Sequence, residues 1–378
     1  MGEIYFDNSS TTKVCRAAAE KVMEMMTENY GNPSSLHTMG FRAEQALNAA
    51  RAKVAAPLGA RPEEIYFTSG GTESNNIALF GAAHARRKRG IRIVTTMIEH
   101  PSVLNTMKEL EKEGFEVIYL KPDEAGQIRP EQVYTAVTPD TILVSMMCVN
   151  NEVGSILPLE AVPTAIAASK APALFHVDAV QAFGKLPLNP GKLKIDLMSA
   201  SAHKIHGPKG VGALYLKKGV HILPHTFGGG QEKNIRPGTE SMPLIAGFGA
   251  AVEELHDAAA QLKQMQELNT YCRARLGELD DVCIHSPENA LPFILSFSGG
   301  GIRSETMLHY LADKEIYVSS GSACSKGKPS HVLTAMGLSR GKVDSSLRLS
   351  FSRFNTKEEI DVFIETLKKC FTELTKRP

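Results

Sequence analysis

The most constraining feature of the sequence is a series of short apolar segments that alternate with helical patterns between about residues 60 and 220. The segments are almost continuously apolar, which is typical of parallel strands buried on both faces. In chain order they read EIYFT, IRIVTT, FEVIYL, TILVSMM, ALFHVD, IDLMSAS and VGALYL. This alternation predicts an α/β domain built on a mostly parallel, seven-stranded sheet.

The pattern changes after Pro243. One long helical pattern, IAGFGAAVEELHDAAAQLKQMQELNTYCRARL, precedes the short segments VCIHS, PFILSFS, IYVSS and SLRLSFS and a closing helix from Thr356. We predict a smaller α+β domain here, linked to the first by the long helix. A chain of 378 residues exceeds the roughly 250–300 residues at which single cores stop growing. The predicted large domain spans residues 15–255, and residues 1–14 and 256–378 form the predicted small domain. Periodicity alone does not show which of the two domains IYFDNSS packs against.

Charge and cysteine content narrow the function classes. The 42 basic and 41 acidic residues give a net charge of +1, without the basic excess that nucleic-acid binding needs. The sequence has no run of 18 apolar residues that would span a membrane. The 6 cysteines are scattered, and MGEIYFDNSS lacks the basic-then-apolar pattern of a secretion signal. We therefore expect a cytoplasmic protein.

Polar residues follow the predicted strands, at the sheet edge where open α/β sheets bind ligands. EIYFT is followed by SGGTESNN, in which Gly71 and Thr72 open a helix whose backbone N–H groups suit a phosphate. The other strand ends are followed by His100, by Asn150 and Asn151, by Asp178 and Gln181, and by Ser201, His203, Lys204 and His206. Each of these residues alone also fits a structural role, such as a helix cap or a surface lysine.

Taken together, the strand-end residues favour one cofactor. A zinc site would draw on His100, His176, His203 and His206, and would leave Lys204 and the glycine turn without a role. Pyridoxal phosphate (PLP) uses the whole set, because it needs a lysine for a Schiff base, a carboxylate at the ring nitrogen, a phosphate cradle and a flat partner for the ring. We therefore predict PLP as the cofactor and no metal.

A second region carries a reactive group of another kind. The segment SSGSACSKGKPS, residues 319–330, is small and polar, and it places the thiol of Cys324 on a predicted loop. A thiol that acts as a nucleophile must be reachable and able to ionise. Cys148, by contrast, lies in a predicted strand, where it is either an inert buried thiol or a neighbour of the cofactor.

These motifs, in this order, resemble those of the NifS/IscS-type cysteine desulfurases of the class V aminotransferase family. The resemblance runs almost end to end, and its most specific parts are SAHKIHGPKG and SSGSAC. Further matching segments are YFDNSSTT, YGNPSSLH, TSGGTESNN, EHPSV, VNNEVG, HVDAVQ, RPGTES and SSLRLSFSRF. The resemblance implies the PLP-dependent transferase fold of type I.

The resemblance also implies a role for each site residue. Lys204 binds the cofactor and moves protons at the substrate Cα, His100 stacks on the ring, and Cys324 is the nucleophile that takes sulfur. Asp178 pairs with the ring nitrogen, and Gln181 and Asn151 bind the ring oxygen. The phosphate is held by Gly71, Thr72, Ser201 and His203, with Thr239 reaching the phosphate of the other subunit of a homodimer. Arg348, helped by Asn151, clamps the substrate carboxylate.

The implied function is PLP-dependent removal of sulfur from L-cysteine. The products are L-alanine and a persulfide on Cys324, whose sulfur passes to an acceptor protein in Fe–S cluster assembly or in tRNA or cofactor thiolation. The alternatives are a selenocysteine lyase or another class V aminotransferase, a zinc hydrolase, and a binding partner without catalytic activity. The joint presence of Lys204, Asp178, His100, Arg348 and Cys324 argues against the last.

Overall fold

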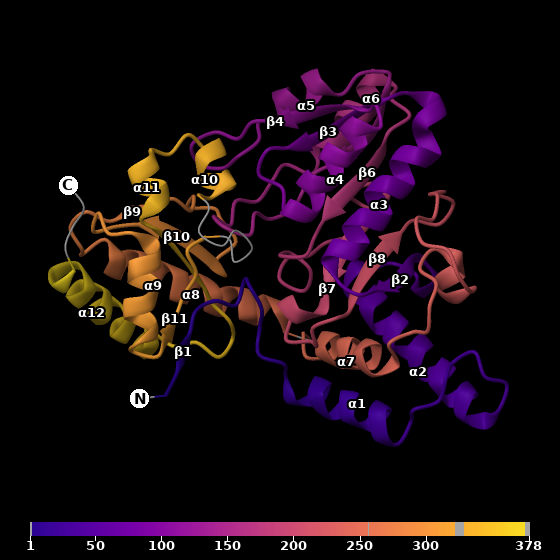
Figure 1. The fold of residues 1–378 in the computed structure, drawn as a ribbon, viewed down its shortest axis with the longest axis horizontal. Helices are drawn as coiled ribbons and strands as arrows, with labels where there is room; N and C mark the ends of the chain where they lie inside the picture. The colour runs from indigo at the N-terminus through magenta and orange to yellow at the C-terminus, as the bar shows by residue number, and fades with distance from the viewer. Residues whose placement is uncertain (1, 256, 322–328, 375–378) are drawn as a thin grey trace.

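The computed structural model describes residues 2–255, 257–321 and 329–374, so Cys324 lies outside the described residues. Figure 1 shows the large sheet and its helices on one side and the C-terminal elements on the other. No helix within the described ranges combines the length and the apolar character needed to cross a bilayer.

The large sheet contains all the strands predicted between residues 60 and 220. Its order is β2-β8-β7-β6-β5-β3-β4, and β8 runs antiparallel to both of its neighbours while the other pairs are parallel. The prediction of a mostly parallel, seven-stranded sheet is therefore confirmed. The strands are β2 (Ile65–Thr68), β3 (Arg92–Thr96), β4 (Glu116–Leu120), β5 (Thr141–Ser145), β6 (Leu174–Asp178), β7 (Leu197–Ser201) and β8 (Gly212–Leu216).

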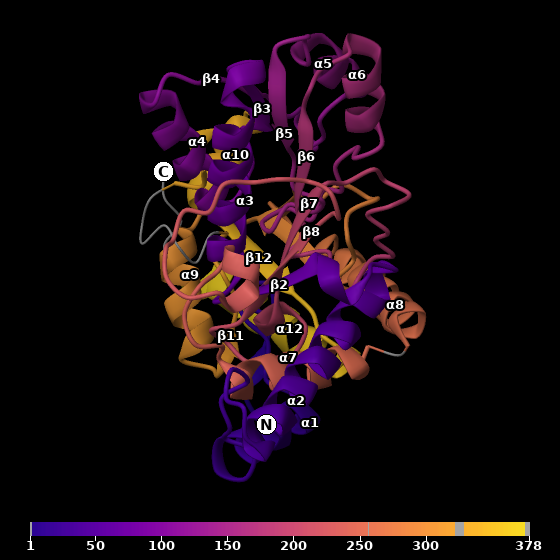
Figure 2. The same ribbon diagram turned by 90° about the vertical axis from the view of Figure 1, so that its right-hand side faces the viewer.

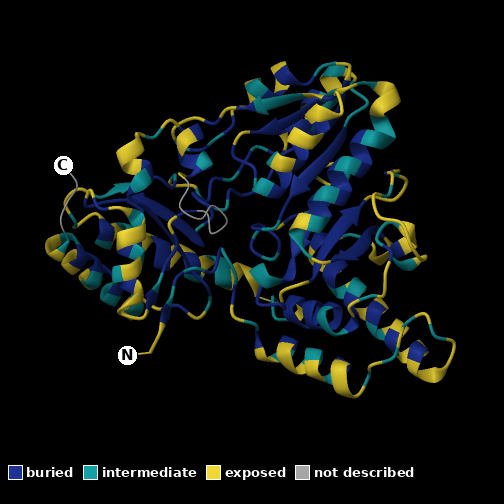
Figure 3. Ribbon diagram, in the orientation of Figure 1, coloured by how far each residue is buried: buried dark blue, intermediate teal, exposed yellow. Residues whose placement is uncertain are grey.

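Helices cover both faces of this sheet because its strands are apolar on both sides. On one face, α3 (Gly71–Arg86) and α4 (Pro101–Lys112) pack Ile77, Val103 and Met107 against Ile93 and Ile142. On the other face, α7 (Met242–Glu253) contacts α1 (Arg16–Thr27) and α2 (Thr38–Ala55). Figure 2 shows α5 (Pro130–Ala136) and α6 (Ala161–Ser169) at one end of the molecule and α1 and α2 at the other. In Figure 3 most strands of this sheet are buried, with the edge strand β4 as the exception, whereas α1 and α2 each present an exposed side.

The C-terminal part is built on two small sheets. The strands β9 (Cys283–Ile284), β10 (Ile294–Ser298) and β12 (Ser346–Ser350) form an antiparallel sheet in the order β12-β10-β9. The N-terminal β1 (Ile4–Tyr5) pairs in parallel with β11 (Ile316–Tyr317), so the start of the chain shares a sheet with the C-terminal part. The helices of this part are α8 (Ala258–Leu276), α9 (Ser304–Ala312), α10 (His331–Ala335), α11 (Arg340–Asp344) and α12 (Lys357–Glu373). The pairing of β1 with β11 places the N-terminal strand beside the C-terminal part, and the domain division stays a prediction.

The long linking helix predicted after Pro243 is wrong in one respect. The structure has two helices there, α7 and α8, instead of one. The side chain of Asp257 accepts a 3.1 Å hydrogen bond from the backbone N of Ala260 and thereby caps the second helix. A local capping interaction therefore overrides a continuous helical pattern.

Candidate active site

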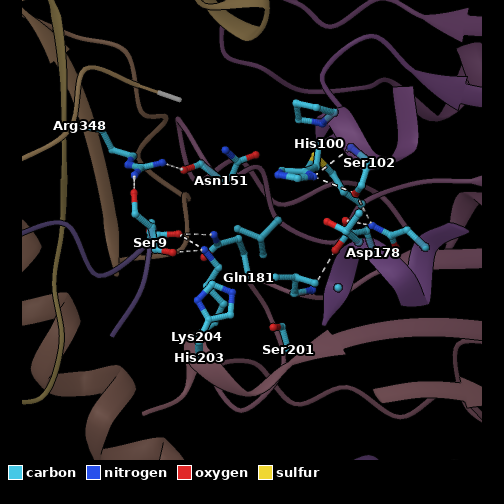
Figure 4. A pocket seen from close by; sticks show the side chains of 18 residues that line it. Ser9, His100, Ser102, Asn151, Asp178, Gln181, Ser201, His203, Lys204 and Arg348 are labelled. Carbon is cyan, nitrogen blue, oxygen red and sulfur yellow. Dashed lines mark hydrogen bonds between the residues drawn. The ribbon is translucent and has the colours of Figure 1, made fainter. Parts of the chain in front are cut away.

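A cavity of about 270 Å³ lies at the carboxyl ends of the large sheet's strands, where β12 approaches them. Figure 4 shows the side chains that line it. The predicted site residues around this cavity are Gly71, Thr72, His100, Asn151, Asp178, Gln181, Ser201, His203, Lys204 and Arg348. The fold thus gathers residues from separate strand ends into one place.

Lys204 follows β7 in a short 3-10 helix and points toward the N-terminal segment. Its Nζ donates hydrogen bonds to the carbonyl oxygens of Ser9 and Ser10, the second at 2.8 Å. These two carbonyls hold the amine at the edge of the cavity. The amine is therefore among the groups that line the cavity.

Asp178 ends β6 and is buried. Its Oδ2 accepts a 2.8 Å hydrogen bond from Asn75 Nδ2, and its Oδ1 accepts one of 3.0 Å from the backbone N of Val180. Asn75 Nδ2 also donates to Ser102 Oγ at 2.9 Å, and Ser102 Oγ lies 2.8 Å from His100 Nδ1. A chain of hydrogen bonds therefore connects the carboxylate to the imidazole.

His100 caps the start of α4, as one of its sequence interpretations suggested. Its Nδ1 accepts a 3.1 Å hydrogen bond from the backbone N of Ser102. Burial lowers the pKa of His100, Lys204 lowers it further, and the charge of Asp178 opposes the shift. The ring therefore stays neutral near pH 7, which suits a group that stacks on a cofactor and exchanges protons.

The N-terminus of α3 forms the opposite end of the cavity. A Cβ at Gly71 would come within 2.6 Å of Val180 Cγ2, so a larger residue at the start of this turn would displace Val180. Ser201 and His203 line the same region, and burial lowers the pKa of His203 to about 4. Unpaired helix N–H groups with two neutral donors fit a phosphate.

The amide of Gln181 is oriented by contacts on both of its ends. Its Nε2 donates to the carbonyl of Ser9 at 3.0 Å, and its Oε1 accepts from Lys185 Nζ at 3.5 Å. Burial lowers the pKa of Lys185 to about 8. The amide nitrogen therefore uses one of its two N–H groups on Ser9, which leaves the other as the donor that a ring oxygen would need.

Arg348 lies on β12 and is 2% exposed. Its Nη1 donates to the carbonyl of Asn151 at 2.8 Å, and its Nη2 donates to Asp7 Oδ1 and to Ser10 Oγ, each at 2.8 Å. Its Nε is buried and has no partner among the described residues. The guanidinium is thus fixed and keeps a donor for a ligand.

Several candidates from the sequence lie elsewhere. Asn150 turns away from the cavity and holds a tight turn, with its Oδ1 accepting from the backbone N of Glu152 at 2.8 Å. His176 is enclosed between the hydroxyls of Ser145 and Ser199 in the sheet. His206 bonds the carbonyl of Lys13 at 2.8 Å. Among the described residues, no group of three or more His, Cys, Asp or Glu side chains is arranged to hold a metal ion.

Thr239 and Cys148 lie outside the cavity. Thr239 is exposed and does not line the cavity of its own chain. Its predicted contact with the other subunit therefore stays a prediction, as do the roles assigned to Cys324, which lies outside the described ranges. Cys148 is buried, does not line the cavity, and has a pKa raised to about 12 by burial. Its thiol is therefore not reactive at neutral pH.

The donor set around the cavity fits PLP. An amine, a buried carboxylate, a neutral imidazole and a helix N-terminus surround one space, and these are the kinds of group that the aldehyde, ring nitrogen, ring face and phosphate of PLP need. Residues 4–363 match the family model described as aminotransferase class V. This chain belongs to the class V aminotransferase family. The resemblance and the fold class predicted from the sequence are thereby confirmed.

Class V relatives of known name resemble this chain over nearly its whole length. A protein named cysteine desulfurase IscS from Methanosarcina thermophila is 43% identical, over 98% of this chain and 92% of that protein. Another of that name, from Escherichia coli O139:H28, is 42% identical, over 98% of this chain and 93% of that protein.

Solved structures give the same result. A structure titled NifS-like protein has a TM-score of 0.93 and 41% identity, over 98% of this chain and 100% of that one. A structure titled SspA in complex with cysteine has a TM-score of 0.82 and 36% identity, over 93% of this chain and 100% of that one.

Sequence reasoning missed several residues of this class V site. Ser9, Ser10, Asn75 and Ser102 line the cavity and bond the predicted residues. Ser9 and Ser10 lie in YFDNSSTT and Asn75 lies in TSGGTESNN, two segments already noted for the resemblance. The position of these residues in segments shared with the family could have marked them as candidates. It could not show which residues they contact.

Proposed function

We propose that this protein is a PLP-dependent cysteine desulfurase. The observation that carries the proposal is the double contact of Ser10. Its carbonyl accepts from Lys204 Nζ and its hydroxyl accepts from Arg348 Nη2, each at 2.8 Å. The amine and the guanidinium therefore contact the same residue, so an amino acid bound between them would have its Cα near the amine and its carboxylate near the guanidinium.

Each residue has a definite task in the proposed reaction. When bound, PLP supplies an electron sink that stabilises negative charge at the substrate Cα. Gly71, Thr72, Ser201 and His203 would hold its phosphate, Asp178 its ring nitrogen, and Gln181 and Asn151 its ring oxygen. Arg348 holds the substrate carboxylate, because a guanidinium binds carboxylates through parallel hydrogen bonds. Lys204 moves a proton at Cα, and neutral His100 would stack on the bound ring and accept or return a proton.

Cys324 is the proposed acceptor of sulfur, on the strength of the SSGSAC motif. Its thiolate attacks the sulfur of the substrate, an S–S bond forms and the C–S bond breaks. The electron pair of the broken bond stays on the carbon, which takes a proton and leaves as L-alanine. The persulfide sulfur then passes to an acceptor protein of Fe–S cluster assembly or of tRNA or cofactor thiolation.

We also propose a homodimer that works in the cytoplasm. Large apolar side chains gather on α1, α2 and the segment between them: Met23 is 61% exposed, Met26 60%, Tyr30 67%, Leu36 106% and Phe41 57%. An apolar face of this kind favours burial against another chain. The proposed contact of Thr239 with the phosphate of the other subunit requires such a second copy. The described cysteines are all free thiols, which suits a reducing compartment.

Mass spectrometry after addition of L-cysteine to the PLP-loaded protein tests this proposal. We expect L-alanine in solution without an added keto acid, and one extra sulfur on the peptide that contains Cys324. Cys324→Ser should abolish the label, and Lys204→Arg should lower alanine formation by about 10²–10⁴-fold, with Lys218→Arg as the surface control. Alanine formation that requires a keto acid would instead indicate an aminotransferase. Full sulfur transfer by Cys324→Ser would contradict the role of this cysteine.

A further inference from the structure

The guanidinium of Arg348 already has a carboxylate partner within the protein. Asp7 Oδ1 accepts from Arg348 Nη2 at 2.8 Å, and the two side chains are 20% and 2% exposed. The Ser10 hydroxyl closes a triangle with this pair, because it donates to Asp7 Oδ1 at 2.7 Å and accepts from Nη2 at 2.8 Å. Arg348, which is proposed to bind the carboxylate of the substrate, is thus already paired with a carboxylate of the protein.

Asp7 is held firmly in this position. Its backbone forms a bridge with Ser350 on the strand of Arg348, and the hydroxyl of Tyr5 donates to its carbonyl at 3.1 Å. The pKa of Tyr5 is raised to about 12, by burial first and then by the charge of Asp7, while Arg348 opposes the shift. The backbone of Asp7 is therefore anchored beside the strand that carries Arg348.

The guanidinium nevertheless keeps donors for a ligand. Arginine has five N–H donors, and the described residues accept from Nη1 once and from Nη2 twice. Nε is buried and has no partner among the described residues. An incoming carboxylate can bind these donors, but it then shares one cation with Asp7.

Two other charged groups act on Arg348. Lys185 is buried, and its pKa is lowered by burial and then by the charge of Arg348. Glu152 is also buried, and the charge of Arg348 is among the influences that lower its pKa against the larger effect of burial. Neither has a hydrogen bond to the guanidinium among the described residues, whereas Asp7 does. Asp7 is therefore the negative group that competes most directly with a bound carboxylate.

We propose that Asp7 sets the affinity of the site for amino-acid carboxylates by competing for Arg348. The proposal rests on the proposed function and adds a specificity-determining residue to it. Without Asp7, the guanidinium would bind both the substrate and the product more tightly, since L-cysteine and L-alanine carry the same carboxylate. The pair with Asp7 lowers this affinity, and it therefore favours release of alanine after sulfur transfer.

Equilibrium titration calorimetry of the PLP-loaded protein with L-alanine tests this role without turnover. Asp7→Asn keeps an acceptor for Arg348 and Ser10 but removes the charge, and it should bind L-alanine about tenfold more tightly than the wild type. L-Alaninamide, which lacks the carboxylate, should bind both proteins equally. Ser10→Ala, which keeps the Asp7 charge, should not tighten the binding of L-alanine.

Asp7→Ser is prepared in parallel, so that the test does not depend on the folding of a single variant. If the folded charge-removing variants bind L-alanine as weakly as the wild type or more weakly, Asp7 only orients Arg348 and the proposal is overturned. Equal tightening for L-alaninamide would overturn it as well, because the effect would not involve the carboxylate. A wild-type protein that binds no L-alanine and forms none from L-cysteine would overturn the proposed function along with it.

Discussion

Asn75 Nδ2 donates a 2.8 Å hydrogen bond to Asp178 Oδ2, from the first turns of α3 to the end of β6. Both side chains are buried, so the carboxylate has little water to replace this donor. The same amide nitrogen bonds Ser102, the neighbour of His100. Asn75 therefore connects Asp178 and His100, the two residues proposed to contact the cofactor ring.

Loss of this amide should weaken cofactor binding. A buried polar group left without its partner costs about 1–3 kcal/mol, so Asn75→Ala should raise the dissociation constant for PLP about tenfold or more. Titration of the cofactor-free protein with PLP measures this. Asn76→Ala is the matched control, because Asn76 Nδ2 bonds the carbonyl of Thr72 and does not contact Asp178. Equal PLP affinity for the wild type and Asn75→Ala would contradict the positioning role.

The buried imidazole of His176 should make the protein less stable in mild acid. Burial lowers its pKa to about 3, while an unfolded histidine titrates near ~6.5. Between these values the unfolded chain binds more protons, so the free energy of unfolding falls as the pH falls. The contribution is complete above the unfolded pKa, and its loss approaches about 1.4 kcal/mol per pH unit.

Urea unfolding at pH 7.5 and pH 5.5 measures this slope. In His176→Gln the free energy of unfolding should change less between the two pH values, because the protein takes up roughly one proton fewer on unfolding. His309→Gln changes an exposed histidine and should keep the wild-type difference. An unchanged slope in His176→Gln would show that other groups carry the acid sensitivity.

The carboxyl group of Glu99 should have the opposite pH dependence. Burial raises its pKa to about 8, although its Oε1 accepts hydrogen bonds from Thr96 Oγ1 and Met147 N, each at 2.8 Å. An unfolded glutamate titrates near ~4.3, so above that pH the folded protein binds the extra proton. The stabilisation is complete below the unfolded pKa and is lost as the pH rises through the folded pKa.

Glu99→Gln removes this titration. Its free energy of unfolding, measured relative to the wild type, should rise between pH 5 and pH 8 by up to about 1.4 kcal/mol per pH unit. Glu28→Gln, at an exposed position, is the control. A constant difference between Glu99→Gln and the wild type across this range would contradict the raised pKa.

The exposed side chain of Leu36 should contribute to the proposed dimer. Leu36→Asp places a charge on the apolar face of α1 and α2, and it should weaken dimerisation at least about tenfold. Light scattering after size-exclusion chromatography gives the mass. Phe354→Asp, at a side chain 54% exposed in the C-terminal part, is the control and should keep the wild-type mass. A monomeric wild-type protein would rule out the proposed contact of Thr239 with a second subunit.

The sequence by itself determined the α/β class, the strands of the large sheet and the residues that follow them. These features depend on local patterns, since a strand buried on both faces must be apolar and its polar neighbours must come after it. Lys204, Asp178 and His100 could be found in this way because each lies at the end of its own strand. The resemblance added Arg348, which no strand pattern singles out, and it gave the role of sulfur acceptor to Cys324, which the composition of its loop segment had already marked as a candidate nucleophile.

Only the tertiary structure decided how the site is connected. Ser10 lies 194 positions from Lys204 and 338 from Arg348, yet it bonds both, and Asp7 lies 341 positions from the same guanidinium. Periodicity could not assign the N-terminal segment to a domain, distinguish Asn151 from Asn150, or pair Asn75 with Asp178. Contacts at such separations depend on how whole elements pack, and a local pattern carries no record of that packing.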